Sequence, residues 1–222
     1  NAMSTAWSTA SIPDLSGKVA IVTGGNIGLG FHTSLELARK GARVTIACRS
    51  PDKGQAAIER ARKEVPDAKL DTLRLDLVDL DSVRAFAESF SAKSDTLDIL
   101  VNNAGVVSLD EHTLTSSGQE MHMATNHLGH FALVGHLYPN LLASPAARVV
   151  SVTSGGYRFG VIDFDDFAWT KREYKKMKCY GDSKLANLLF MLELQRRFEA
   201  ARCQAVSVAA HPGLTATERH HG

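Results

Sequence analysis

The 222-residue sequence has few cysteines and no motif that would join them. Its three cysteines, Cys48, Cys179 and Cys203, lie far apart, are odd in number and form no Cys-x-x-Cys pair. This usage argues against a disulfide framework and against a zinc knuckle. Because free cysteines are typical of a reducing compartment, we expect a cytoplasmic location.

An excess of charge and long apolar runs are also lacking. Lysine and arginine number 25 against 24 acidic residues, so the formal net charge is +1. No global field would attract nucleic acid or an anionic membrane, and any anion must be bound by a local site. No stretch approaches the roughly 18 consecutive apolar residues of a membrane span. We therefore expect no nucleic-acid partner and no membrane span.

The N-terminal segment differs in composition from the rest of the chain. Asn1-Ala2 ahead of Met3 is typical of an expression-tag remnant, and we expect residues 1–15 to be this remnant and a polar tail. No linker, repeat or low-complexity tract divides the remainder. The length suits one compact domain, so residues 16–222 are interpreted as a single domain.

Short apolar runs alternate with longer segments of helical period. Strands are expected at residues 18–22, 43–47, 70–75, 97–101, 148–152 and 205–209. Helices are expected near residues 31–40, 52–64, 80–90, 118–142 and 178–202. Nearly all-apolar strands separated by helices predict a Rossmann-type, doubly wound α/β fold with a parallel sheet covered on both faces. We expect this fold to lack its C-terminal helix and strand, because the chain stops soon after the sixth predicted strand.

A glycine-rich segment, Thr23 to Gly30, follows the first predicted strand. Its spacing, Gly-x-x-x-Gly-x-Gly, differs from the Gly-x-Gly-x-x-Gly of the usual dinucleotide fingerprint. A helix N-terminus attracts a pyrophosphate where glycine lets the backbone approach, because its N–H groups are unpaired and its dipole is positive there. A turn without a ligand is the alternative for the glycines alone. Their place between a strand and a helix favours phosphate binding.

In this context the segment resembles the cofactor motif of the short-chain dehydrogenase/reductase family, which binds NAD or NADP. Asn102-Asn103-Ala104-Gly105 matches the family's Asn-Asn-Ala-Gly, and Asp76-Leu77 matches a position that contacts adenine in the family. The resemblance covers almost the whole chain. It implies cofactor contacts at Gly24, Asn26, Ile27, Gly28, Leu29, Gly30, Asp76, Leu77, Asn103, Ala104 and Gly105.

The end of the second predicted strand bears on the choice of cofactor. An enzyme that prefers NAD usually has a carboxylate there to bind the ribose 2′-hydroxyl. Here the segment reads Ala47-Cys48-Arg49-Ser50, without an acid, and the Arg49 guanidinium is a planar donor suited to a phosphate. We therefore expect NADP rather than NAD, with a solvated surface arginine as the alternative.

Tyr180 and Lys184 form a Tyr-x-x-x-Lys motif within the last predicted helix. Residues four apart share one helix face, and a nearby ammonium favours the phenolate form of tyrosine. The pair alone is common by chance, but the family resemblance supplies partners for it. Ser154 resembles the family's serine, which holds the substrate carbonyl oxygen. Asn126 resembles the helix asparagine that supports a water chain leading to the lysine.

The resemblance implies further contacts near the nicotinamide. Pro212 and Gly213 match the family's Pro-Gly turn beside this ring, and Thr217 stands where a threonine commonly meets the carboxamide. Tyr180 would act as general acid and base, and both Tyr180 and Lys184 would also contact the cofactor. The long interval between Ser154 and Tyr180 is similar to the retinol-dehydrogenase-like branch, which suggests a lipophilic substrate.

The resemblance therefore implies an NADP-dependent oxidoreductase that moves a hydride between nicotinamide and a small-molecule carbonyl or alcohol. The alternative is an idle NADP-binding sensor or scaffold, although such a protein would not need the proton-transfer residues. In this family the helix with the tyrosine often packs against its copy, so a homodimer or homotetramer is plausible. Its apolar stripe would otherwise belong to the domain core, and comprises Leu185, Leu188, Leu189 and Leu192.

Two groups of polar residues suggest other functions that we consider weaker. No carboxylate stands at a metal-site spacing from the histidines of the fourth predicted helix, so we expect no metal and favour a polar helix face or a subunit contact. These histidines are His122, His127, His130 and His136. The basic run from Lys171 to Lys178 is interpreted as a solvated helix face rather than an anion site.

Overall fold

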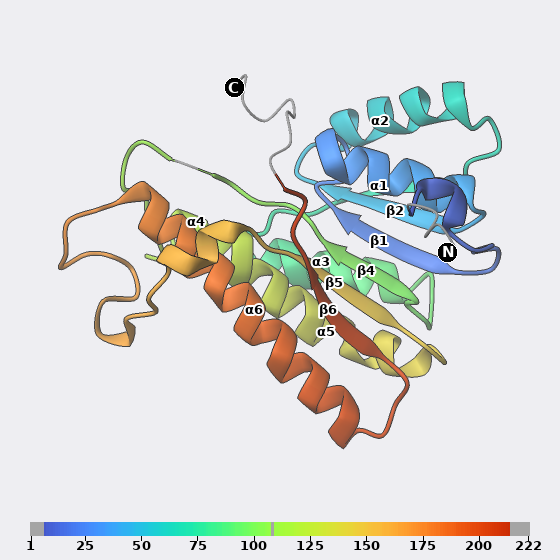
Figure 1. The fold of residues 1–222 in the computed structure, drawn as a ribbon. Helices are drawn as coiled ribbons and strands as arrows, with labels where there is room; N and C mark the ends of the chain where they lie inside the picture. The colour runs from blue at the N-terminus through green and yellow to red at the C-terminus, as the bar shows by residue number, and fades with distance from the viewer. Residues whose placement is uncertain (1–6, 108, 214–222) are drawn as a thin grey trace, which may run out of the picture.

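Figure 1 shows a computed structural model of the chain, which describes residues 7–107 and 109–213. One sheet of six parallel strands has the order β3-β2-β1-β4-β5-β6. The strands are β1 (Val19–Thr23), β2 (Arg43–Cys48), β3 (Leu70–Arg74), β4 (Ile99–Asn102), β5 (Arg148–Val152) and β6 (Val206–Ala210). This confirms the predicted Rossmann-type fold, and no strand follows β6 within the described residues.

Helices connect the strands and cover both faces of the sheet (Figure 1). The α-helices are α1 (Gly28–Arg39), α2 (Pro51–Glu64), α3 (Leu80–Ser91), α4 (Met121–Met123), α5 (Gly129–Ala143) and α6 (Lys176–Ala200). The 3-10 and π-helical turns are η1 (Thr9–Ser11), η2 (Ala124–Leu128), η3 (Gly155–Phe159) and η4 (Phe164–Asp166). Among the described residues, no helix is both long and apolar enough to cross a bilayer.

The strand order creates a switch point between β1 and β4. The chain passes from β1 outward to β2 and β3, and then returns to β4 on the other side of β1. Val22 pairs with Val101 across these two strands, so both carboxyl ends meet at one edge of the sheet. Ligands of open α/β sheets bind in the crevice at such a point, because the connections diverge from it in opposite directions.

Alternation of side chains along the strands builds a core on each face of the sheet. Ile21 packs in the cluster that includes residues of α3, α5 and α6. Its neighbour Val22 packs in the cluster that includes residues of α1 and α2. Successive strand residues point to opposite faces, so apolar runs such as β1, in which every residue is buried, supply both cores.

The predicted helix over residues 118–142 is divided in the structure. Gly118 has a φ of +78° and precedes the helical region, which opens at α4 with Glu120 as its N-cap. The segment η2 between α4 and α5 is a π-helical turn. A π-turn inserts one residue and so changes the direction in which its side chains point. This turn contains Asn126.

The prediction of a solvated helix face over Lys171 to Lys178 is wrong for the first half of this segment. The segment 171–175 is irregular and α6 begins only at Lys176. The Arg172 guanidinium stacks 3.6 Å from the ring centroid of Trp169 and pairs with Asp166 and Asp182, both at 3.4 Å. Asp166 and Asp182 are buried and attract the arginine, so it clamps the irregular segment onto α6.

Candidate functional site

A cleft of about 1110 Å³ opens at the carboxyl ends of the strands. It brings together residues that lie almost 200 positions apart in the chain, from the glycine turn to the segment after β6. The predicted residues that line it are Gly24, Asn26, Ile27, Leu29, Arg49, Asp76, Leu77, Asn103, Ala104, Gly105, Ser154, Tyr180, Lys184, Pro212 and Gly213. Gly28, Gly30 and Asn126 are not among the residues that line it, and Thr217 falls outside the described residues.

The glycine turn is shaped so that only glycine fits at its key positions. Gly24 and Gly28 have φ values of +63° and +52°, a region that side chains disfavour. A Cβ on Gly30 would collide with the Gly24 carbonyl oxygen, so helix α1 could not approach β1 as closely. The N-cap of α1 is Ile27, which has no side-chain oxygen to accept from the first N–H groups. The helix therefore presents donors and a positive dipole end to the cleft.

The turn is tied to the end of β4 through side-chain hydrogen bonds. The Asn103 side chain donates to the Thr23 carbonyl at 2.8 Å, and the Asn103 backbone N–H donates to the Thr23 hydroxyl at 2.9 Å. The Ala104 N–H donates to the same hydroxyl at 3.0 Å. These contacts fix the two loops of the switch point relative to each other.

The cleft is basic at the end of β2. Arg49 and Lys53 are exposed and line it together with Ser50, the N-cap of α2, whose hydroxyl accepts from the Lys53 N–H at 3.4 Å. No carboxylate of the β2 end joins them. Two cations beside a helix N-terminus can bind a phosphate monoester.

Tyr180, Lys184 and Ser154 border the opposite part of the cleft. Lys184 Nζ lies 5.6 Å from the centroid of the Tyr180 ring and donates to the Val152 carbonyl at 3.0 Å. A methyl group on Gly156 would lie 3.0 Å from Tyr180 Cε1 and 3.6 Å from Ser154 Oγ. The serine hydroxyl and the tyrosine ring therefore adjoin the same small space.

Asn126 supports this arrangement from below the cleft. Its side chain accepts from the Val106 N–H at 2.7 Å and donates to the Val106 carbonyl at 3.0 Å. Its amide also donates to Ser183 on the tyrosine helix at 2.9 Å. The buried side chain thus joins the segment after β4 to α6. The water chain expected to lead from Asn126 to Lys184 stays a prediction.

Some lining residues were not predicted from the sequence. Lys53 is one turn into α2, and its position could have been found by placing the helix start at Ser50. Val106, Thr125 and His211 also line the cleft. Whether these residues reach the cleft depends on the conformation of the loops and on the π-turn, and neither leaves a local signal in the sequence.

The interpretation of the four histidines as a polar helix face or subunit contact is wrong for two of them. His122 and His130 are buried inside the domain, His127 is half-buried, and His136 is exposed. His130 Nδ1 donates to the Asn126 carbonyl at 3.1 Å, so its Nε2 accepts from the Thr23 hydroxyl at 2.8 Å. Burial lowers the pKa of His130 to about 3. In the described ranges, no group of three histidine, cysteine or acidic side chains could hold a metal ion.

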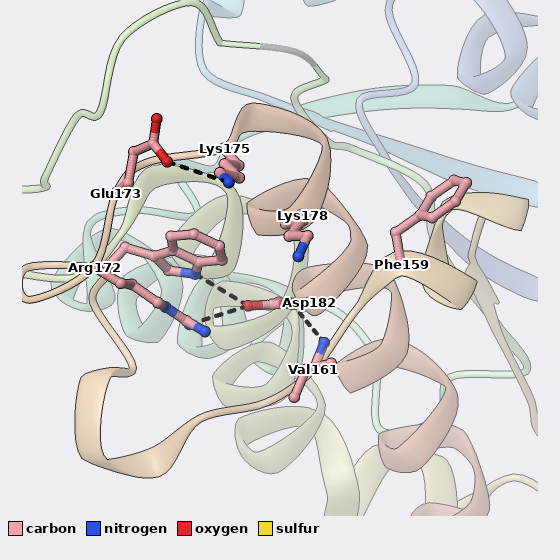
Figure 2. Close-up of a pocket in the computed structure, with 8 residues that line it drawn as sticks. Phe159, Val161, Arg172, Glu173, Lys175, Lys178 and Asp182 are labelled. Carbon is pink, nitrogen blue, oxygen red and sulfur yellow. Dashed lines mark hydrogen bonds and ion pairs between the residues drawn. The ribbon is translucent and has the colours of Figure 1, made fainter.

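A second cavity of about 220 Å³ lies beside the N-terminal turns of α6 (Figure 2). Asp182 forms its buried wall and accepts from the Val161 N–H at 2.8 Å and from the Trp169 indole N–H at 3.0 Å. Burial raises the pKa of the Asp182 carboxyl, although these hydrogen bonds and Arg172 act in the opposite direction. The cavity is thus built on the clamp that holds the irregular segment.

A sequence model of the family described as short chain dehydrogenase matches residues 18–221. The chain belongs to the short chain dehydrogenase family. Human retinol dehydrogenase 13 is 43% identical over 97% of this chain and 64% of its own length. Mouse retinol dehydrogenase 12 is 45% identical over 91% of this chain and 63% of its own length. The chain thus spans slightly less than two thirds of the length of these two relatives, and it is similar to the retinol dehydrogenase branch.

Solved structures of the family share the fold. A crystal structure of an uncharacterized protein from Mycobacterium Paratuberculosis aligns with a TM-score of 0.86 at 42% identity, covering 95% of this chain and 74% of that chain. The Pseudomonas aeruginosa RhlG/NADP active-site complex aligns with a TM-score of 0.75 at 25% identity, covering 94% and 77%.

Proposed function

We propose that this short chain dehydrogenase is an NADP-dependent oxidoreductase that acts on a lipophilic carbonyl or alcohol. The observation that carries the proposal is the position of Tyr180 and Lys184, which line the same cleft as the glycine turn and Arg49. The relatives named retinol dehydrogenase support a lipophilic substrate. The cleft also includes apolar side chains, among them Val107, Leu109 and Met121.

The residues present fit a dinucleotide phosphate cofactor. Gly24, Ile27 and Leu29 line the cleft at the α1 N-terminus, whose uncapped N–H groups can bind a pyrophosphate. Arg49 and Lys53 would bind the 2′-phosphate that distinguishes NADP from NAD, and Asp76 and Leu77 would border the adenine. When bound, the cofactor supplies or takes up the hydride.

The proposed chemistry of the chain's own residues is proton transfer and charge stabilisation. Tyr180 and Ser154 donate hydrogen bonds to the substrate oxygen, where negative charge develops during reduction. The Lys184 ammonium stabilises the phenolate that Tyr180 becomes after it gives up its proton. Asn126 holds α6 and the segment after β4 in place around this site. In the alcohol-oxidising direction the same groups act in reverse.

The proposal is tested by NADPH oxidation with a panel of aldehydes, ketones and quinones, run beside Tyr180→Phe. This variant removes one hydroxyl and keeps the ring, so NADPH binding measured by fluorescence should persist. We expect its turnover to fall by a factor of about 100 or more. Equal rates in the two proteins would exclude Tyr180 as the proton donor. Cofactor binding without turnover by the unmodified chain would favour a sensor or scaffold instead.

A further inference from the structure

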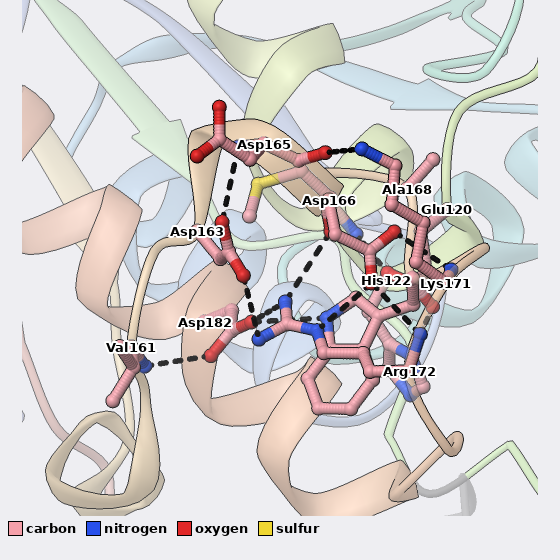
Figure 3. Close-up of polar contacts among 12 residues, drawn as sticks. Glu120, His122, Val161, Asp163, Asp165, Asp166, Ala168, Lys171, Arg172 and Asp182 are labelled. Carbon is pink, nitrogen blue, oxygen red and sulfur yellow. Dashed lines mark hydrogen bonds and ion pairs between the residues drawn. The ribbon is translucent and has the colours of Figure 1, made fainter.

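Glu120 and His122 form a buried pair that has no role in the reaction as proposed above. They are 1% and 0% exposed. His122 Nδ1 lies 2.8 Å from one Glu120 oxygen, and the other oxygen accepts from the Met123 N–H at 2.8 Å. Figure 3 shows the pair close to the aspartate cluster that surrounds Arg172. Burial favours a raised pKa for the Glu120 carboxyl, but its hydrogen bonds with His122 and Met123 hold the pKa below its ordinary value.

The hydrogen bonds of His122 define its tautomer. The Leu109 backbone N–H donates to His122 Nε2 at 3.4 Å, so this nitrogen keeps its lone pair. The ring proton is then on Nδ1, where the Glu120 carboxylate accepts it. A carboxylate that binds one ring nitrogen commonly sets the role of the other.

His122 also contacts the ring of Tyr180. Their ring centroids lie 6.2 Å apart at an interplanar angle of 68°, an edge-to-face arrangement. The Tyr180 ring closely approaches Gly156 as well, where an added methyl would lie 3.0 Å from Cε1. The imidazole and the glycine backbone together restrict the orientation of the phenol.

Leu109 connects the same histidine to the wall of the cleft. Its N–H donates to His122, and its carbonyl accepts from the Tyr174 hydroxyl at 2.8 Å. The Tyr174 hydroxyl keeps its proton at neutral pH, and burial raises its pKa further, to about 12. The Leu109 peptide, which lines the cleft, is therefore held on both sides.

We propose that Glu120 and His122 are positioning residues: the carboxylate sets the imidazole tautomer, and the imidazole orients Tyr180 and the Leu109 wall. This inference rests on the proposed oxidoreductase function. It assigns a role to two buried ionisable groups that do not themselves touch the substrate.

The decisive variant is Glu120→Gln, which keeps the size of the side chain. A glutamine cannot accept from both the Met123 N–H and the His122 Nδ1–H, because one of its two terminal atoms is a donor. If its oxygen stays on Met123, its amide donates to Nδ1 and the ring proton moves to Nε2, facing the Leu109 N–H. We expect kcat to fall about tenfold, as for the loss of one hydrogen bond, with KM for NADPH within about twofold of the original.

A second variant separates ring packing from the polar links. His122→Phe keeps an aromatic edge against Tyr180 but cannot bond to Glu120 or Leu109, and we expect kcat to fall at least as far. Ser144→Ala is the matched control, because it removes a buried hydroxyl that donates to Asp98 at 2.9 Å, away from the cleft. It should leave kcat unchanged. NADPH binding by each variant verifies its fold.

An independent measurement uses ¹⁵N imidazole NMR on histidine-labelled protein. We expect the Nδ1–H tautomer for His122 in the original chain and the Nε2–H tautomer in Glu120→Gln. An Nε2–H tautomer in the original chain, or an active Glu120→Gln with unchanged kcat, would overturn the inference. If the original chain reduces no carbonyl of the panel, the proposed function and the positioning role both fail, whereas the NMR result still decides the tautomer.

Discussion

The Asn126 amide donates to the Ser183 hydroxyl at 2.9 Å, and that hydroxyl donates to the Tyr180 carbonyl at 2.7 Å. The π-turn η2 is therefore bonded to the first half of α6, where the proposed proton donor lies. Ser183 is fully buried. If its hydroxyl were removed, the Asn126 amide could not bond to bulk water instead.

The first prediction concerns this relay. Ser183→Ala should lower the free energy of unfolding by about 1–3 kcal/mol, because it leaves a buried amide donor unpaired. It should also lower kcat, since Asn126 and α6 lose a shared contact. Ser207 is a matched control: it is buried, and its hydroxyl has no hydrogen-bond partner among the described residues. Urea unfolding of Ser207→Ala should show little loss, and equal destabilisation of both variants would contradict the prediction.

The second prediction concerns the space beside the tyrosine ring. Gly156→Ala places a methyl 3.0 Å from Tyr180 Cε1, which is too close for an ordinary contact. The ring must shift, so kcat should fall severalfold while the Kd for NADPH stays within about twofold. Gly135 in α5 has nothing within 4 Å of an added methyl. Gly135→Ala should keep full activity and gain about 0.5–1 kcal/mol in helix stability.

The third prediction concerns cofactor preference. Arg49→Asp should lower the affinity for NADPH by about ten- to a hundredfold, because a carboxylate repels the 2′-phosphate. The ratio of NADPH affinity to NADH affinity should therefore fall. Lys53→Ala should lower NADPH affinity by a smaller factor. Lys63→Ala is the control, because Lys63 is exposed near the other end of α2, and it should leave the affinities for both cofactors unchanged. Fluorescence titration with both cofactors measures the ratio, and an unchanged ratio in Arg49→Asp would refute the assignment.

The fourth prediction concerns stability in acid. Burial lowers the pKa of His130 to about 3, below its ordinary value of 6.5. The unfolded chain therefore binds one more proton than the folded chain between these values, and stability falls as the pH falls below 6.5. At about 1.4 kcal/mol per pH unit, this histidine should lower the free energy of unfolding by about 2 kcal/mol between pH 7 and pH 5.

Urea unfolding at both pH values tests this effect. His130→Gln should lose about 2 kcal/mol less than the original chain over the same interval. His136→Gln, in the same helix but exposed, should keep the original pH dependence. The same loss in all three proteins would show that His130 is not the responsible group.

The fifth prediction concerns self-association. Leu189 and Leu192 on α6 are 50% and 60% exposed, and Phe131 on α5 is 57% exposed. These residues are exposed, so the outer part of the apolar stripe, Leu189 and Leu192, can pack against a second copy. We expect the chain to elute as a dimer or tetramer and Leu192→Arg to shift it toward the monomer in light scattering. Phe164→Ser, a change at another exposed aromatic residue, should leave the oligomeric state unchanged. If the original chain is a monomer, this interface does not exist.

Local patterns predicted much of the fold. Each expected strand lies within two residues of an observed one, because strands buried on both faces of a parallel sheet consist of short, nearly continuous apolar runs. The last expected helix, residues 178–202, corresponds to α6 at Lys176–Ala200. The glycine turn and the Tyr180–Lys184 spacing were also evident, since both depend on residues that are close in sequence.

Contacts between distant segments were not predictable in this way. The π-turn at η2 disrupts a segment whose residues alone favour a continuous helix, and the burial of His130 depends on Thr23, 107 positions away. Arg172 looked like part of a solvated basic run, but three aspartates surround it. Each of these arrangements is stabilised by contacts with residues that lie outside the short segment from which it was predicted.

The amino-acid sequence alone determined the order of strands and helices, the glycine turn and the spacing of Tyr180 and Lys184, because periodicity and backbone freedom act over a few residues. Only the tertiary structure decided that these elements line one cleft, that Lys53 joins Arg49, and that Glu120 and His122 lie against the tyrosine. These outcomes depend on how helices pack on the sheet and on which buried polar groups find partners, and both are properties of the folded chain as a whole.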